Sequence, residues 1–249
     1  MKAVFARPKS LTDEPFPYCP GCGHGIVHGI VAECLDETGL TDRCILVSTI
    51  GCTVRCWRNF DVDVCQGAHG RGLAVATAIK TAHPDKFVLT YQGDGDLAAI
   101  GLSETVHAAS RGEAVTVVFA NNAVYGATGG QMAPTTLMGQ SASTCLEGRD
   151  PQHGGYPIKM CELLATLPAP AYLARGSVDS AANRQKTKAL VKKAFMAQMN
   201  YGVFSLVEIL SPCPVNLKLS PPDALRWVRE QMIPFYPLGE FKLPPGGLP

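Results

Sequence analysis

The sequence has no long apolar run and no excess of charge of either sign. No stretch approaches the roughly 18 apolar residues that a membrane-spanning helix needs, so we expect no membrane association. The formal net charge of +1 gives no reason to expect nucleic acid as a partner. Residues 1–15 lack the apolar core and small-residue cleavage site of a signal peptide, and we therefore expect a cytoplasmic protein.

The composition is that of a large globular domain. Hydrophobic residues make up 46% of the 249 residues and charged residues 17%, which is enough for one well-buried core. The sequence contains no internal repeat and no clear domain boundary. We predict a single domain, residues 1–249, with an irregular N-terminal arm and a Pro-rich C-terminal tail.

The most informative stretch covers residues 87–130. Apolar runs at 87–91 and 115–120 are typical of buried strands, and the amphipathic segment between them is typical of a helix, so together they predict a βαβ unit with parallel strands. The first run leads into GDGD at residues 93–96 and the second into NN at 121–122. Both polar groups then lie at the carboxyl edge of the sheet, where open α/β sheets bind their ligands.

The residue types at this edge predict Mg²⁺ held together with a diphosphate. Asp94 offers a hard anionic oxygen and Asn122 a neutral one, whereas a second carboxylate would repel the diphosphate. Gly93 and Gly95 let the backbone come close to a bulky group. The alternative is two ordinary turns, because Gly, Asp and Asn are common turn residues.

The rest of the chain predicts a doubly wound, mostly parallel α/β sheet. Strands are expected at residues 44–48, 62–67, 171–174 and 204–210, and helices at residues 25–39, 73–79, 161–167, 181–198 and 221–232. The segment 131–157 has no clear periodicity and is rich in Thr, Gly, Pro and Ser. Loops of this length are usually functional or docked onto a partner, so we expect a docking surface there.

The chain contains ten cysteines, which a reducing compartment keeps free for metal binding, catalysis or packing. Cys19 and Cys22 form a CxxC motif, and Cys52 and Cys213 each follow a predicted strand at the same edge of the sheet. Four thiolates converging there suit either Zn²⁺ or a [4Fe–4S] cluster, and their chemistry alone does not separate the two. Cys56 is an alternative ligand to Cys52, and Cys213 could instead be a core cysteine.

These motifs together resemble one family. GDG followed by NN resembles the diphosphate-binding motif of thiamine diphosphate enzymes. CPGCGH, IGC, HGR, GDGD with NNxVYG, and SPCP resemble the β subunit of 2-oxoacid:ferredoxin oxidoreductases, of the 2-oxoglutarate or 2-oxoisovalerate type, over residues 18–235. The resemblance implies the thiamine diphosphate-binding (diphosphate-domain) fold, with thiamine diphosphate, Mg²⁺ and a [4Fe–4S] cluster as cofactors.

The resemblance also implies a set of site residues. The magnesium ligands fall on Asp94, Asn122 and the backbone carbonyl of Val124, and the cluster ligands on Cys19, Cys22, Cys52 and Cys213. The cofactor contacts fall on Ile50, Gly51, Cys52, Thr53, His69, Gly95, Asp96, Gly126 and Ala127. His69 is the predicted catalytic residue, and the alternative for it is a helix-capping or core histidine.

The implied activity is oxidative decarboxylation of a 2-oxoacid to an acyl-CoA, with electrons passing through the cluster to ferredoxin. The implied partners are an α subunit with the pyrimidine-binding half of the site, further γ and δ subunits, ferredoxin, coenzyme A and the 2-oxoacid. The alternatives are a non-redox thiamine diphosphate-dependent decarboxylase subunit and a zinc-stabilised, non-catalytic binding subunit. Residues 55–60 and 66–68 depart from the family's pattern beside the predicted substrate side, so the 2-oxoacid is not predicted.

Overall fold

A seven-stranded sheet forms the centre of the protein. The computed structural model describes residues 6–247, so residues 1–5 of the predicted arm and 248–249 of the predicted tail lie outside the described residues. The strands are β1 (Cys44–Ser48), β2 (Asp63–Gln66), β3 (Phe87–Gly93), β4 (Thr116–Asn121), β5 (Ala171–Ser177), β6 (Phe204–Leu210) and β7 (Gly239–Lys242). Their order is β2-β1-β3-β4-β6-β5-β7, and only β7 pairs antiparallel.

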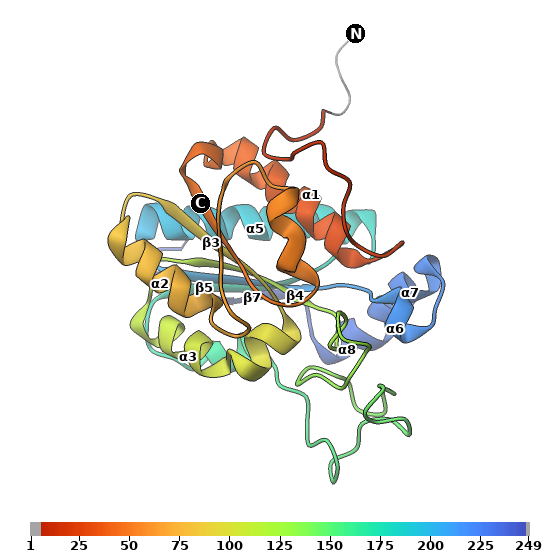
Figure 1. Ribbon diagram of the computed structural model, residues 1–249. Coiled ribbons are helices and arrows are strands. Elements are labelled where there is room, and N and C mark those ends of the chain that lie inside the picture. The colour runs from red at the N-terminus through yellow and green to blue at the C-terminus, as the bar shows by residue number, and fades with distance from the viewer. Residues whose placement is uncertain (1–5, 248–249) are drawn as a thin grey trace.

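Helices cover both faces of this sheet, which confirms the predicted doubly wound α/β fold (Figure 1). One face packs against α1 (Gly23–Thr38) and α5 (Ala181–Tyr201), and the other against α2 (Gly72–Ala82), α3 (Leu102–Arg111) and α4 (Met160–Ala165). A smaller cluster lies beyond the sheet edge, around α7 (Pro221–Trp227) and the π-helical turn η4 (Val228–Met232). The short helices α6 (Pro214–Leu217) and α8 (Ile233–Phe235) flank them.

Local sequence explains where the long elements begin and end. Every residue of β4, and all but the last of β3, is buried, as expected of central parallel strands covered on both faces. Helix α1 ends at Gly39, the predicted stop, with φ 64° in the left-handed region. Helix α5 begins after Ser180, whose hydroxyl accepts a hydrogen bond of 3.2 Å from the Asn183 amide.

Two short elements lie where the sequence shows no periodic pattern. A 3₁₀ helix, η2 (Cys52–Arg58), is separated from β1 by three residues, and its two turns are too short to display a helical repeat. The segment predicted as a Pro-rich tail contains the edge strand β7, which pairs with β5. None of the helices within residues 6–247 is long and apolar enough to cross a membrane.

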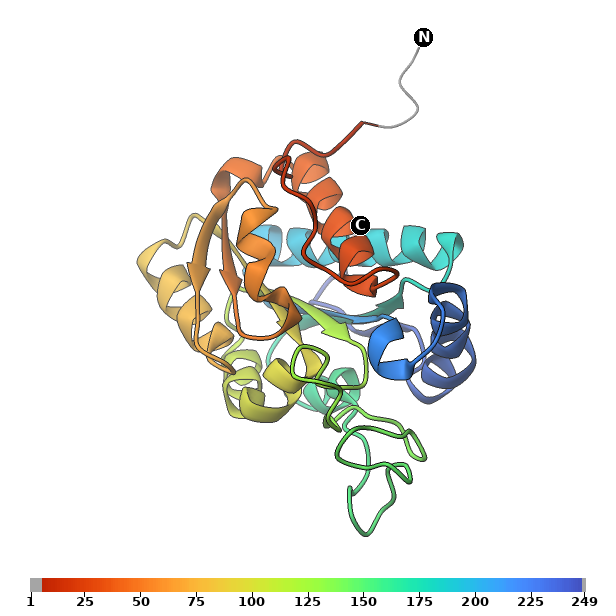
Figure 2. The ribbon, with the colours of Figure 1, turned by 45° about the vertical axis from the view of Figure 1, so that its right-hand side comes forward.

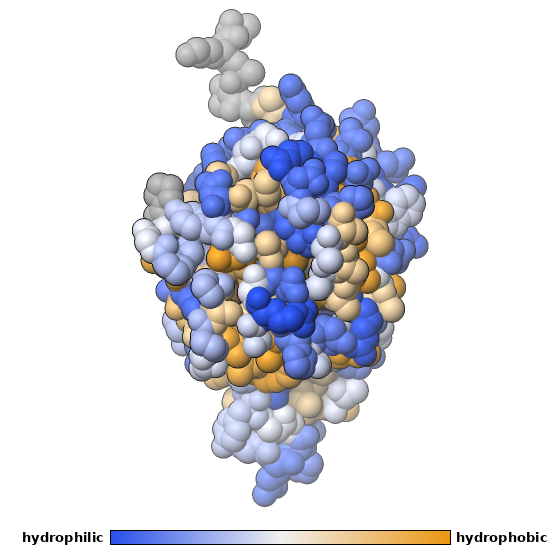
Figure 3. Space-filling model, turned by 90° about the vertical axis from the view of Figure 1, so that its left-hand side faces the viewer, coloured by the Kyte–Doolittle hydropathy of each residue, from blue (hydrophilic) through white to orange (hydrophobic). Residues whose placement is uncertain are grey.

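The long segment between β4 and α4 is irregular, as predicted. Figures 1 and 2 both show it extending away from the sheet at the end where α6 and α7 lie. Leu146 and Tyr156 in this segment are 76% and 73% exposed. Figure 3 shows another face of the molecule, on which hydrophilic and apolar residues are interspersed.

The described part of the N-terminal arm packs onto α1 through aromatic side chains. The Tyr18 hydroxyl lies 3.0 Å from His28 Nδ1, and the Tyr91 hydroxyl on β3 lies 2.6 Å from His24 Nδ1. The His28 ring also stacks on Phe16, with centroids 5.1 Å apart. Burial lowers the pKa of His24 to about 4 and that of His28 to about 3, so both rings are neutral in the folded protein.

We expect acid to destabilise the fold through His28, and His28→Phe to reduce that sensitivity. The unfolded state binds a proton near the ordinary pKa of 6.5 while the folded state does not until about 3, so stability is lost as pH falls between these values. Removing the imidazole should flatten the slope by about 1.4 kcal/mol per pH unit between about pH 6 and 4. Urea unfolding at several pH values measures this, with exposed His107→Gln as control. Equal slopes in wild type and His28→Phe would contradict the assignment.

Candidate functional site

Four neighbouring parallel strands end at one edge of the sheet. The strands β1, β3, β4 and β6 are adjacent and run in the same direction, so the residues that follow them are brought together. These residues include Cys52, Asp94, Asn122 and Cys213. The strand order reverses between β1 and β3, which makes this edge a topological switch point, the place where such sheets bind ligands.

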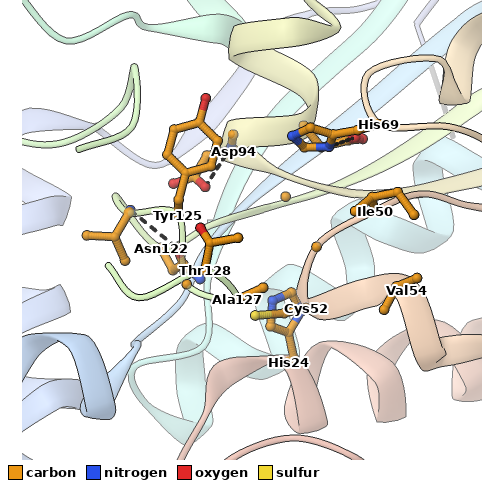
Figure 4. A pocket seen from close by; sticks show the side chains of 16 residues that line it. His24, Ile50, Cys52, Val54, His69, Asp94, Asn122, Tyr125, Ala127 and Thr128 are labelled. Carbon is orange, nitrogen blue, oxygen red and sulfur yellow. Dashed lines mark hydrogen bonds and ion pairs between the residues drawn. The ribbon is translucent and has the colours of Figure 1, made fainter. Parts of the chain in front are cut away.

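A cavity of about 320 Å³ opens at this edge (Figure 4). Of the residues predicted to contact the cofactor or its metal, all but Thr53 line it. Thr53 is 1% exposed, and its hydroxyl has no hydrogen-bond partner within residues 6–247. The cavity is also lined by His24 and Val54, which were absent from the predicted set: His24 ends the CPGCGH motif but received no role there, and no motif includes Val54.

Asp94 is a buried carboxylate at the base of this cavity. Its Oδ2 accepts a hydrogen bond of 2.8 Å from the Thr135 hydroxyl, and its Oδ1 accepts one of 2.8 Å from the Gly95 amide. Burial raises the pKa of Asp94 to about 6, while hydrogen bonds from Thr135, Gly95, Ala123 and Val124 act in the opposite direction. The carboxylate therefore lies against the turn that follows β4, as the βαβ spacing predicted.

The two asparagines after β4 have different surroundings. Asn121 faces the sheet, where its Nδ2 donates to Glu208 Oε1 at 2.7 Å, whereas Asn122 lines the cavity. Asn122 Oδ1 accepts a hydrogen bond of 3.3 Å from the Val124 amide. Ala123, which lies between Asn122 and Val124, has a positive φ of 60°. A non-glycine residue in this region is strained, and such strain persists only where the surroundings impose it.

The surroundings that impose it come from the long segment after β4. The Thr136 hydroxyl and Gln140 Nε2 both donate to the Ala123 carbonyl, at 2.6 and 3.2 Å. Arg149 holds the segment itself, because its guanidinium donates to six backbone carbonyls, those of Ala133, Pro134, Thr136, Gly154, Gly155 and Tyr156. The segment predicted as a docking surface thus also supports Asp94 and the turn at Ala123.

His69 is oriented by a second buried carboxylate, Asp96. The His69 Nδ1 lies 2.7 Å from Asp96 Oδ1, and the Gly70 amide donates to the same oxygen at 2.7 Å. Asp96 Oδ2 accepts from the Thr49 hydroxyl at 2.6 Å and from Gln92 Nε2. Since both oxygens of Asp96 already have donors, its side chain fixes the ring of His69 at the cavity wall (Figure 4).

Three of the four predicted cluster cysteines are partly or wholly buried beside the cavity. The Sγ atoms of Cys52 and Cys213 lie 3.3 and 3.7 Å from the position that a Cβ on Gly126 would take. Burial raises the pKa of Cys22 to about 12, and the thiols of Cys213, Cys52 and Cys19 also raise it, so the four are neighbours. Within residues 6–247, no three His, Cys, Asp or Glu side chains stand at metal-ligand spacing.

The loop that carries Cys19 and Cys22 is held against the segment before Cys213. The Gly23 amide donates to the Pro212 carbonyl at 3.2 Å. A Cβ on Gly23 would lie 2.4 Å from the Cβ of Ser211, so only glycine fits at this contact. The alternative ligand, Cys56, is fully buried in the apolar core beneath α1.

Comparisons with known proteins agree on one family. Residues 50–209 match the model of the thiamine pyrophosphate enzyme, C-terminal TPP binding domain. The chain is 45% identical over 239 residues to ketoisovalerate oxidoreductase subunit VorA of Methanothermobacter thermautotrophicus, covering 96% of this chain and 50% of that protein. It is 34% identical over 230 residues to 2-oxoglutarate synthase subunit KorB of Archaeoglobus fulgidus, covering 92% and 82%. The chain thus spans about half the length of the VorA relative.

A solved structure of a related oxidoreductase also matches this chain. It is the 2-oxoglutarate:ferredoxin oxidoreductase from Magnetococcus marinus with 2-oxoglutarate, coenzyme A and succinyl-CoA bound. The match has a TM-score of 0.78 at 29% sequence identity and covers 92% of this chain and 74% of that one.

We expect Asp96→Asn to destabilise the protein, because four donors converge on its two oxygens. An amide offers one acceptor oxygen and one NH₂ group, and the NH₂ group would face donors and leave them unpaired, a loss of about 2–4 kcal/mol. Urea unfolding measures the loss, and exposed Asp85→Asn, which should leave stability unchanged, is the matched control. If the two variants unfolded at the same urea concentration, the Asp96 network would not contribute to stability.

Proposed function

Because this chain belongs to the family of 2-oxoacid:ferredoxin oxidoreductase β subunits, we propose that it binds thiamine diphosphate and takes part in the oxidative decarboxylation of a 2-oxoacid to an acyl-CoA. The observation that carries the proposal is the meeting, at one cavity, of the buried Asp94, the turn at Asn122–Val124 and the thiols around Gly126. The substrate class and coenzyme A are supported by the names of the relatives and by the ligands of the Magnetococcus marinus enzyme.

The magnesium ligands we propose are Asp94, Asn122 and the carbonyl of Val124. A buried carboxylate whose pKa is raised by desolvation gains from a nearby cation, because the cation favours the charged form. Asp94 and Asn122 supply the oxygen ligands that Mg²⁺ prefers, and a diphosphate would complete them. Gly126 lacks the Cβ that would come within 3.5 Å of Asn122 Nδ2 and 3.3 Å of Cys52 Sγ, so this corner of the cavity is kept open.

When bound, thiamine diphosphate would supply the nucleophile and the electron sink that decarboxylation of a 2-oxoacid needs. The residues of this chain would bind the cofactor, orient it and exclude water from the cavity. His69, with its Nδ1 fixed by Asp96, has its Nε2 left to hold or transfer a proton. Apolar groups of Ile50, Val54 and Ala127 line the cavity and reduce its water content.

We further propose that Cys19, Cys22, Cys52 and Cys213 hold a [4Fe–4S] cluster. The proposal is supported by the contact of the Cys19–Cys22 loop with Pro212 and by the Sγ atoms of Cys52 and Cys213, which lie 3.3 and 3.7 Å from the position that a Cβ on Gly126 would take. Thiolates are the ligands that such clusters require. Cys52 also lines the cavity, so one loop would serve both cofactors and give electrons a short exit.

The partners we propose are an α subunit with the pyrimidine-binding half of the site, γ and δ subunits, and ferredoxin. The relatives are named as subunits, and the exposed apolar side chains of Leu146 and Tyr156 offer surface for an α subunit to cover. Iron and sulfide content, visible spectrum and thiamine diphosphate binding of the anaerobically purified protein test both cofactors. Zinc in place of iron would refute the electron-transfer role, and full activity from this chain alone would refute the need for an α subunit.

We expect Asp94→Ala to weaken Mg²⁺-dependent binding of thiamine diphosphate by about 100-fold or more, since even outer partners of metal ligands are typically worth about 10–100-fold. Asn122→Asp should also weaken binding, because it adds negative charge beside the diphosphate. Isothermal titration with and without Mg²⁺ gives both affinities, and exposed Asp85→Ala is the control. Unchanged affinity in Asp94→Ala would rule out this carboxylate as a metal ligand.

We expect Cys213→Ser to lower iron content and ferredoxin reduction while leaving thiamine diphosphate binding largely in place. Cys56→Ser should change none of these, because Cys56 belongs to the apolar core. Iron analysis and the visible spectrum of the two variants, purified anaerobically side by side, make the comparison. Loss of iron from Cys56→Ser and its retention in Cys213→Ser would show that the ligand set is wrong.

A further inference from the structure

Asn216 joins the two halves of the site through one side-chain amide. It lies half-buried on the short helix α6, three residues after Cys213. Its Nδ2 donates to Cys213 Sγ at 3.1 Å and to the Gly126 carbonyl at 3.2 Å. One acceptor is a proposed cluster ligand and the other belongs to the loop that lines the cofactor cavity.

The orientation of this amide follows from its neighbours. Both partners, a sulfur and a carbonyl oxygen, are acceptors, so the NH₂ group must face them. On the other side, a Cβ on Gly130 would lie 2.6 Å from Asn216 Oδ1, so the amide packs closely against the backbone of the same loop. The amide therefore bridges the 126–130 loop and the segment that carries Cys213.

The contact with Cys213 favours negative charge on the sulfur. The Asn216 Nδ2 group lies 3.1 Å from the Cys213 sulfur, and an N–H donor at that distance stabilises negative charge on it. Donors to a ligand sulfur are among the features that set the reduction potential of an iron–sulfur cluster. Because reduction adds an electron to the cluster, an N–H group beside the sulfur stabilises the reduced form.

We propose that Asn216 is a positioning residue that couples occupancy of the thiamine diphosphate cavity to the reduction potential of the cluster. A cofactor that shifts the Gly126 carbonyl changes how Asn216 divides its two N–H groups between oxygen and sulfur. The inference rests on the proposed function, since it requires both cofactors on this chain. Linkage makes the effect reciprocal, so the redox state of the cluster must alter thiamine diphosphate affinity by the same factor.

The test is a redox titration of the anaerobically purified complex, followed by electron paramagnetic resonance, with and without thiamine diphosphate and Mg²⁺. In wild type we expect thiamine diphosphate affinity to differ between the oxidised and reduced cluster by about fivefold or more. For a one-electron couple this equals a potential shift of about 40 mV. Asn216→Leu, which removes the donor, should lower the potential and abolish the shift.

Two further variants complete the design. Asn216→Asp has the same shape, replaces the NH₂ group by an acceptor, and should lower the potential while also abolishing the shift, so it serves if the leucine variant does not fold. Val215→Ala changes the exposed neighbour on α6 and should behave as wild type. The coupling is refuted if thiamine diphosphate does not shift the reduction potential in wild type. It is also refuted if the shift persists in the Asn216 variants. Wild-type protein without a cluster refutes instead the proposed function on which the coupling rests.

Discussion

Parallel pairing of β1, β3, β4 and β6 is the constraint on which the rest of the structure depends. Strands that run the same way end at the same edge, so four connections far apart in sequence are forced to meet there. Helices on both faces bury the strands, and the carboxyl edge between them is where the cavity opens. The cavity, the carboxylates of Asp94 and Asp96, and the thiols of Cys52 and Cys213 lie at that edge because they follow strands that run in one direction.

Two carboxylates only two residues apart are used in opposite ways. Asp96 is surrounded by donors from Thr49, His69, Gly70 and Gln92, so it serves the protein's own architecture. Asp94 also accepts hydrogen bonds, but burial still keeps its pKa above the ordinary range, and the residue lines the cavity. Burying a carboxylate in this way costs stability, and a cation beside it, as we propose for Mg²⁺, would offset that cost.

The sequence was sufficient for contacts that follow from strand order, but not for contacts made by irregular chain. The GDGD and NN motifs predicted the neighbouring positions of Asp94 and Asn122, because parallel strands have few ways to pair. The Thr135 contact to Asp94, 41 residues away, and the Asn216 contact to Gly126, 90 residues away, depend on loop paths that no periodicity reveals. The roles assigned to the site residues and the single-domain boundary stay predictions.

The six carbonyl oxygens around Arg149 have a consequence for how the protein opens and closes. Peptide groups that share one buried cation cannot be released one at a time, because moving any of them away leaves the guanidinium poorly solvated. Residues 133–136 and 154–156 are therefore tied together through one side chain, which favours their opening as a unit. Since Thr135 lies in the first of these stretches and donates to Asp94, opening of the unit would also remove one hydrogen bond from the carboxylate in the cavity.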